Sequence, residues 1–168
     1  MIKTKEQIIE YFQSGIKETK YFKIGIEHEK FLFDTKENKR IDYPKVKEMF
    51  TALTEFGWNP VFEKENIIGL NKGGKNITLE PGNQIELSGD KLNHMHEACA
   101  ESQDYLFELK QVTKKLNIKI VSAGFDPISK LEDIPNNPKQ RYELMTQDMP
   151  LGGELSLDMM YRTCGTQL

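Results

Sequence analysis

An acid-bearing β-strand is predicted by the segment Lys23-Ile24-Gly25-Ile26-Glu27-His28-Glu29-Lys30-Phe31-Leu32-Phe33. Successive side chains of a strand point to opposite faces of the sheet, so Glu27 and Glu29 share one face. Two carboxylates on one face repel each other, and a hard cation such as Mg²⁺ relieves that repulsion. The spacing therefore agrees with a metal site, and solvent-exposed acids or acids paired with lysines explain it equally well.

A second acidic pair, Glu80 and Glu86, occurs in Thr78-Leu79-Glu80-Pro81-Gly82-Asn83-Gln84-Ile85-Glu86-Leu87-Ser88. Both acids have the same parity along this extended segment, with apolar residues on the opposite face. Pro81-Gly82 predicts a bulge or a bend, which weakens the inference from parity. Two acid-bearing strands nevertheless indicate a metal site more strongly than either strand alone.

Apolar periodicity and turn residues predict the other elements. We expect helices over residues 5–19, 44–56, 91–116 and 139–147, with a capping box formed by Thr4 and Gln7 and with Asp90 as the N-cap of the longest helix. We expect strands over residues 22–34, 58–62, 66–70, 76–80, 118–125 and 155–166, and a loop over 126–138. Hairpins mixed with helices favour an α+β fold with a mostly antiparallel sheet.

The bulk properties exclude several classes of protein. The chain has 168 residues, 38% hydrophobic and 29% charged, with a formal net charge of −3. The negative charge argues against a nucleic-acid partner. No apolar run approaches the roughly 20 residues that cross a bilayer, and the N-terminus lacks the apolar region of a secretory signal, so we expect a cytoplasmic protein. The two cysteines, Cys99 and Cys164, lack the spacing of a zinc site.

Arginine is scarce, which draws attention to each of its positions. Arg141 opens a predicted short helix and Arg162 lies in a predicted apolar strand. A guanidinium binds a substrate carboxylate bidentately, but a structural salt bridge explains both residues as well. Arg40 lies in a polar, turn-like stretch and is expected on the surface. His28 shares parity with Ile24, Ile26 and Leu32, which favours a core histidine over a catalytic base.

Several blocks of sequence, taken in order, resemble glutamate–cysteine ligases of the plant and proteobacterial type. The first is Gly25-Ile26-Glu27-His28-Glu29-Lys30-Phe31, and the resemblance runs from about residue 20 to the end of the chain. The later blocks are Asn66-Ile67-Ile68-Gly69-Leu70, Leu79-Glu80-Pro81-Gly82 with Gln84-Ile85-Glu86-Leu87-Ser88-Gly89, Pro138-Lys139-Gln140-Arg141-Tyr142-Glu143, and Leu157-Asp158-Met159-Met160-Tyr161-Arg162-Thr163-Cys164.

The resemblance implies a glutamine synthetase-like fold (guanido kinase/carboxylate–amine ligase superfamily): a curved antiparallel sheet with helices on its outer face. It implies ATP-dependent joining of the γ-carboxylate of L-glutamate to the amine of L-cysteine through an acyl phosphate, the first step of glutathione biosynthesis. Mg²⁺ would bridge the ATP phosphates. Glu27, Glu29, Glu80 and Glu86 match the metal-binding acids; Arg141 matches a glutamate-binding residue, and Arg162 is a weaker candidate for the same pocket.

The chain departs from the family pattern in two ways. Asn83 replaces a common glycine, which is a mild change if the backbone there does not have a positive φ. Family members are also much longer, and residues 159–168 read like a strand that is cut in the middle. We therefore expect residues 1–168 to be a single, incomplete catalytic-domain fragment that is inactive alone. The alternatives are a ligase with another acceptor amine and a non-catalytic metal-binding module.

Overall fold

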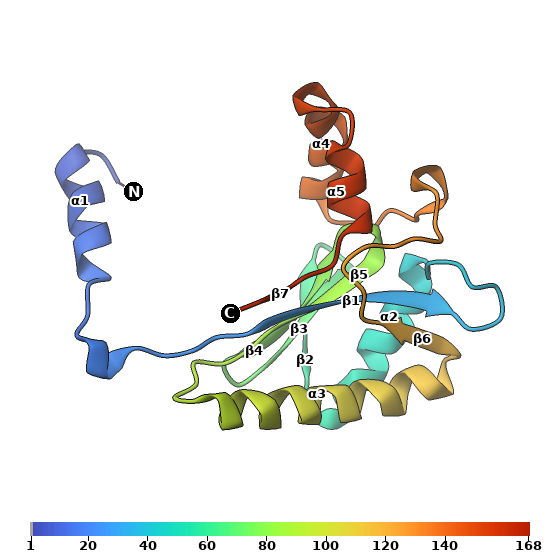
Figure 1. Ribbon diagram of the computed structural model, residues 1–168, viewed down its shortest axis with the longest axis horizontal. Helices are drawn as coiled ribbons and strands as arrows, with labels where there is room; N and C mark the ends of the chain where they lie inside the picture. Colours follow the sequence, from blue (N-terminus) through green and yellow to red (C-terminus); the bar gives the residue numbers. More distant parts are fainter. Residues whose placement is uncertain (1) are drawn as a thin grey trace.

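The computed structural model describes residues 2–168, and its centre is an open antiparallel β-sheet (Figure 1). The strand order is β2-β3-β4-β5-β1-β6, and β7 pairs separately with β1. The strands are β1 (Glu27–Asp34), β2 (Asn59–Glu63), β3 (Asn66–Lys72), β4 (Lys75–Glu80), β5 (Gln84–Ser88), β6 (Ile118–Val121) and β7 (Thr166–Gln167). The predicted α+β class with a mostly antiparallel sheet is confirmed.

Two helices, α2 (Tyr43–Leu53) and α3 (Met95–Lys115), pack on one face of the sheet. The Asp42 side chain caps α2 by accepting a hydrogen bond from the Lys45 amide at 3.1 Å. The apolar stripe of each helix packs on the apolar face of the strands, as expected from the helical and strand periods. The main core contains Leu32, Leu70, Ile77, Leu79, Ile85 and Leu87 from the sheet, Val46, Met49, Phe50 and Leu53 from α2, and Tyr105, Leu109 and Val112 from α3.

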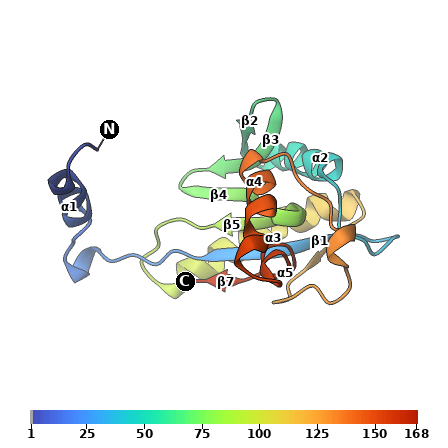
Figure 2. The ribbon, with the colours of Figure 1, turned by 90° about the horizontal axis from the view of Figure 1, so that it is seen from above.

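The opposite side of the sheet carries a smaller layer made by α4 (Gln140–Asp148) and α5 (Ser156–Arg162). Figure 1 shows these two helices side by side above the sheet while α3 runs below it, and Figure 2 shows α4 across the middle strands. A second apolar cluster of Ile134, Tyr142, Met160 and Tyr161 holds this layer together. In the described part of the chain, five short 3₁₀ turns occur: η1 (Thr19–Tyr21), η2 (Thr54–Phe56), η3 (Pro81–Asn83), η4 (Leu131–Asp133) and η5 (Met149–Gly152).

The predicted last strand is wrong for most of its length. Residues Ser156–Arg162 form α5, and only Thr166–Gln167 are extended as β7. Met160 and Tyr161 are buried in the second apolar cluster, and Asp158 pairs with Arg162 across one helical turn at 2.7 Å. These tertiary contacts and the i,i+4 pair stabilise a helix in a segment whose composition looked strand-like.

Two predicted helices are correct in type but longer than observed, whereas β3 and β4 extend beyond the predicted 66–70 and 76–80. Helix α3 begins at Met95 with His94 as its N-cap, whereas Asp90 was expected to fill that role. The helix predicted over 5–19 ends at Ser14, so α1 is Lys5–Ser14; its Thr4–Gln7 capping box is confirmed. No residue of α1 is buried, and Figure 1 shows α1 apart from the sheet. Within residues 2–168, no helix has the length and apolar character that a membrane span requires.

Candidate metal and substrate site

Strands β1, β4 and β5 bring the predicted acids onto one region of the sheet. Glu29 pairs directly with Glu86 across β1 and β5, and Glu27 pairs with Ser88. In β4, Thr78 pairs with Glu86. Alternation places the acids on the face opposite the main core, because their neighbours Leu79, Ile85 and Leu87 lie in that core. The prediction that both acidic pairs face the same way therefore agrees with the register.

The electrostatic environment of Glu86 reflects this crowding. Burial raises the pKa of the Glu86 carboxyl, and the negative charges of Glu80, Glu27 and Glu29 raise it further. A hydrogen bond from Ser88 Oγ at 2.7 Å opposes the shift. Mutual repulsion among carboxylates is the condition that a bound cation relieves, so these four residues fit a divalent metal by their chemistry.

The acids are nevertheless held by protein groups rather than arranged as a closed metal cage. Glu29 Oε2 accepts a hydrogen bond from the Gly165 amide, which ties β1 to the segment before β7. Among residues 2–168, no three His, Cys, Asp or Glu side chains converge in the arrangement of a metal site. The assignment of Glu27, Glu29, Glu80 and Glu86 to a metal therefore stays a prediction, and completing a cage requires other ligands or a change of rotamers.

Glu80 is the centre of a second set of contacts that joins the sheet to α4. Its Oε1 accepts a hydrogen bond from Thr78 Oγ1 at 3.0 Å and lies 3.9 Å from Lys139 Nζ. Its Oε2 accepts a hydrogen bond from the Tyr142 hydroxyl and lies 3.5 Å from Arg141 Nη2. The structure thus brings the predicted substrate-binding Arg141 next to one of the predicted metal ligands.

A cavity of about 400 Å³ lies beside this cluster. Its wall includes Lys139 and Tyr142, and it also includes Asn137, whose side chain donates to the Glu80 carbonyl oxygen at 2.8 Å. Burial lowers the pKa of Lys139, while the charge of Glu80 opposes that shift. These three residues were missed from the sequence as candidates for the site. The signal was that Lys139 and Tyr142 stand beside Arg141 in the block Pro138–Glu143, with Asn137 directly before it, but nothing local showed that this segment folds back onto Glu80.

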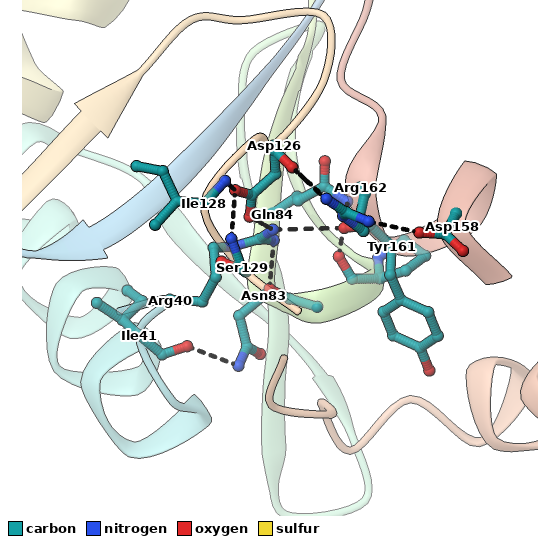
Figure 3. Close-up of polar contacts among 12 residues, drawn as sticks. Arg40, Ile41, Asn83, Gln84, Asp126, Ile128, Ser129, Asp158, Tyr161 and Arg162 are labelled. Atoms are coloured by element: carbon teal, nitrogen blue, oxygen red, sulfur yellow. Dashed lines mark hydrogen bonds and ion pairs between the residues drawn. The ribbon is translucent and has the colours of Figure 1, made fainter. Parts of the chain in front are cut away.

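Arg162 lies in a different environment from Arg141 (Figure 3). Its Nη1 contacts Asp158 Oδ1 at 2.7 Å, and its Nη2 donates to the Asp126 carbonyl oxygen at 2.9 Å. The guanidinium carbon also lies 4.4 Å from the centre of the Phe125 ring. These contacts tie α5 to the preceding loop and favour the structural alternative for Arg162 over the substrate-binding one.

Arg40 is buried, contrary to the expectation of a surface residue. Its side chain and that of Asp126 are both 0% exposed, with Nη1 and Oδ2 3.2 Å apart. Its Nη2 donates to the Gly82 carbonyl oxygen at 2.6 Å, and its guanidinium stacks 4.7 Å from the Phe31 ring centre. Figure 3 shows Arg40 below the loop that carries Asp126. The counter-charge is 86 residues away in sequence, so the local polar composition could not reveal it.

The bend between the two acidic strand segments is a tight turn. Gly82 and Asn83 have φ values of 63° and 60°. Asn83 therefore occupies the left-handed conformation that a glycine adopts most easily, and asparagine is among the other residues that tolerate it. The side chain of Asn83 is fully buried and donates to the Ile41 carbonyl oxygen at 2.9 Å. This hydrogen bond supports the asparagine at its left-handed position.

His28 agrees with the core interpretation. Its Nε2 lies 3.2 Å from the Ser102 hydroxyl on α3, away from the acidic face. Burial lowers the pKa of the imidazole, and the charge of Lys30 lowers it further. A neutral histidine that holds β1 against α3 accounts for these contacts.

The crowding at Glu86 predicts a specific dependence of stability on pH. Its pKa in the folded chain is raised above the ordinary value of 4.5, so the folded state binds this proton more tightly than the unfolded state. The contribution of Glu86 to stability is therefore greatest in acid and is lost as the pH rises from 4.5 through the raised pKa. In metal-free urea unfolding, Glu86→Gln is expected to remove this loss between pH 4.5 and neutrality. An unchanged pH profile in that variant would contradict the repulsion.

Residues 23–168 match the family described as Glutamate-cysteine ligase family 2 (GCS2). The chain belongs to glutamate–cysteine ligase family 2. Glutamate–cysteine ligase A of Oryza sativa subsp. japonica is 43% identical over 98% of this chain and 34% of the relative. The ligase of Medicago truncatula is 43% identical over 98% of this chain and 33% of the relative, and that of Arabidopsis thaliana 42% over 98% and 32%.

The comparison bears on two expectations. The chain spans about a third of the length of the curated relatives that it matches. The expectation of a cytoplasmic location is contradicted, because the relatives are named as chloroplastic proteins. That expectation was based on the lack of an apolar N-terminal signal, and such a test does not detect every targeting route.

Proposed function

We propose that this chain supplies part of the active site of an ATP-dependent ligase that joins the γ-carboxylate of L-glutamate to the amine of L-cysteine. Membership of glutamate–cysteine ligase family 2 supports this reaction. The observation that carries the proposal is the convergence of Glu80 with Arg141 on the same sheet face as Glu27, Glu29 and Glu86. The four acids suit the Mg²⁺ that accompanies ATP, and the neighbouring guanidinium of Arg141 suits a carboxylate of L-glutamate.

Glu27, Glu29, Glu80 and Glu86 are the residues that would hold Mg²⁺ in this chain. When bound, Mg²⁺ neutralises the charge on the phosphates of ATP during phosphoryl transfer. Arg141 is suited to hold a substrate carboxylate because its side chain is 63% exposed although it stands beside Glu80. Its planar guanidinium can bind both oxygens of that carboxylate and so orient the substrate relative to the acidic face.

The finer fold assignment is also part of this proposal. One face of the sheet is covered by α2 and α3, and the acids lie on the other face. This division supports an incomplete glutamine synthetase-like domain whose remaining strands would extend the sheet and add ligands. The absence of a closed cage among residues 2–168 fits that view.

A chimaeric ligase tests the proposal. Residues 1–168 would replace the aligned segment of the rice ligase A, and the products would be measured with ATP, L-glutamate and L-cysteine. We expect γ-glutamylcysteine and ADP in equal amounts, and no product from the 168-residue chain alone. A chimaera that melts like the rice parent but forms neither product contradicts the proposal. Other amines competing with L-cysteine in the same assay would show whether the acceptor is correctly named.

A further inference from the structure

The hydroxyl of Tyr142 lies between the carboxylate of Glu80 and the guanidinium of Arg141. It donates to Glu80 Oε2 and accepts from Arg141 Nη2 at 2.5 Å. The side chain of Tyr142 is only 4% exposed, and its ring packs in the apolar cluster with Ile134 and Tyr161. A buried hydroxyl with two charged partners is held in a defined place by its ring.

The guanidinium of Arg141 is arranged so that most of it stays available. Its carbon stacks 4.6 Å from the Tyr142 ring centre, while Nη2 is 3.5 Å from Glu80 Oε2. That separation is longer than a charge-assisted hydrogen bond of about 2.8 Å. In the part of the chain that the structure describes, the Tyr142 hydroxyl is the one hydrogen-bond acceptor of this side chain. An arginine has five N–H donors, so the others remain for a ligand.

The two oxygens of Glu80 have different partners, which restricts how the cluster can rearrange. Thr78 Oγ1 donates to Oε1 at 3.0 Å, and Lys139 Nζ lies 3.9 Å from the same oxygen. The Lys139 ammonium also lies 5.3 Å from the centre of the Tyr142 ring. The ring therefore contacts one cation from Lys139 and another from Arg141, and its hydroxyl is hydrogen-bonded to both Arg141 Nη2 and Glu80 Oε2, which lie 3.5 Å apart.

We propose that Tyr142 is a positioning residue whose hydroxyl keeps Arg141 and Glu80 from closing into a direct bidentate pair. Glu80 thereby stays available for a metal ion and Arg141 for a substrate carboxylate. This inference rests on the proposed function. Removal of the hydroxyl leaves nothing between the two charged groups, and an arginine and a carboxylate in contact form a bidentate pair that occupies the donors of one and the acceptors of the other.

The test compares Tyr142→Phe with Tyr43→Phe in the chimaeric ligase, which supplies the rest of the site. Phenylalanine keeps the ring and its packing and removes only the hydroxyl. Tyr43 is the matched control, because its hydroxyl makes one hydrogen bond, to the Ile67 carbonyl oxygen at 3.2 Å, and belongs to the α2 side of the sheet. Binding of L-glutamate would be measured by calorimetry, binding of Mn²⁺ by electron paramagnetic resonance, and stability by thermal melting.

We expect Tyr142→Phe to weaken binding of L-glutamate and of Mn²⁺ about tenfold each, because one charge-assisted hydrogen bond is exchanged for a competing ion pair. Tyr43→Phe should lower the melting temperature about as much as Tyr142→Phe does, but it should leave both affinities unchanged. A purely structural role of Tyr142 predicts equal melting shifts and unchanged affinities. If the parent chimaera binds both ligands and Tyr142→Phe binds them equally well, the positioning role is overturned and the proposed function stands.

A parent chimaera that binds neither ligand would instead count against the proposed function. The positioning geometry is then tested without ligands, by urea unfolding of Tyr142→Phe, Arg141→Ala and the double variant. Coupling of more than about threefold in the unfolding constant supports the link through the hydroxyl. Additive effects of the two substitutions overturn it.

Discussion

Replacing Glu27 and Glu29 together by alanine is expected to lower the turnover of the chimaeric ligase at least about a thousandfold. The two carboxylates lie on the same sheet face as Glu86, and their negative charges help to raise the pKa of the Glu86 carboxyl. Their loss removes half of the predicted metal ligands. The charge on the ATP phosphates would then be less well neutralised during phosphoryl transfer. Initial rates of ADP formation at saturating ATP, L-glutamate and L-cysteine would measure the effect.

The control for this double variant is a second pair of acids that carries equal charge elsewhere. Glu37 and Glu55 are exposed and lie outside the acidic face. Replacing both by alanine should leave turnover within about twofold, since exposed charges contribute little. Retention of activity in the Glu27/Glu29 variant would eliminate these residues as metal ligands. Extra Mg²⁺ should not restore the lost activity, because the ligand oxygens themselves are missing.

Replacing Arg40 by methionine is expected to lower the free energy of unfolding by about 3–5 kcal/mol, the usual cost of removing one partner of a buried ion pair. Methionine preserves much of the apolar stem. The Asp126 carboxylate, whose side chain is fully buried, would lose its counter-charge. The carbonyl oxygens of Gly82 and Tyr161 would each lose a donor, which adds to the loss. Urea unfolding followed by circular dichroism measures this quantity.

Two controls separate burial from charge in this prediction. Arg40→Met combined with Asp126→Leu removes both charges and should destabilise the chain less than Arg40→Met alone. Lys20→Ala breaks the exposed pair with Glu18, in which both side chains are more than half exposed, and should change stability by less than about 1 kcal/mol. A loss below about 1 kcal/mol in Arg40→Met would show that the buried pair does not hold the loop and α5 to the sheet.

Local pattern was sufficient for most of the fold. The alternation in β1 and the apolar stripe of α2 each specify one face, and burial of that face against the other is what the main core consists of. The segment of α5 was misread because Met160 and Tyr161 are compatible with a strand as well as a helix. Packing of these two residues against Ile134 and Tyr142, which are distant in sequence, selects the helix over the strand.

The sequence by itself indicated that Glu27 and Glu29 share one face of a strand, because the period of a strand is two. The Pro81-Gly82 bend left the placement of Glu80 and Glu86 open, and the pairing of β4 with β5 brings them onto one face. Only the tertiary structure decided which basic residues meet those acids. Arg141 reaches Glu80 through Tyr142, whereas Arg162 is occupied by Asp126 and Asp158. The contact between Glu80 and Tyr142 spans 62 residues and that between Arg162 and Asp126 spans 36, and no local period records them.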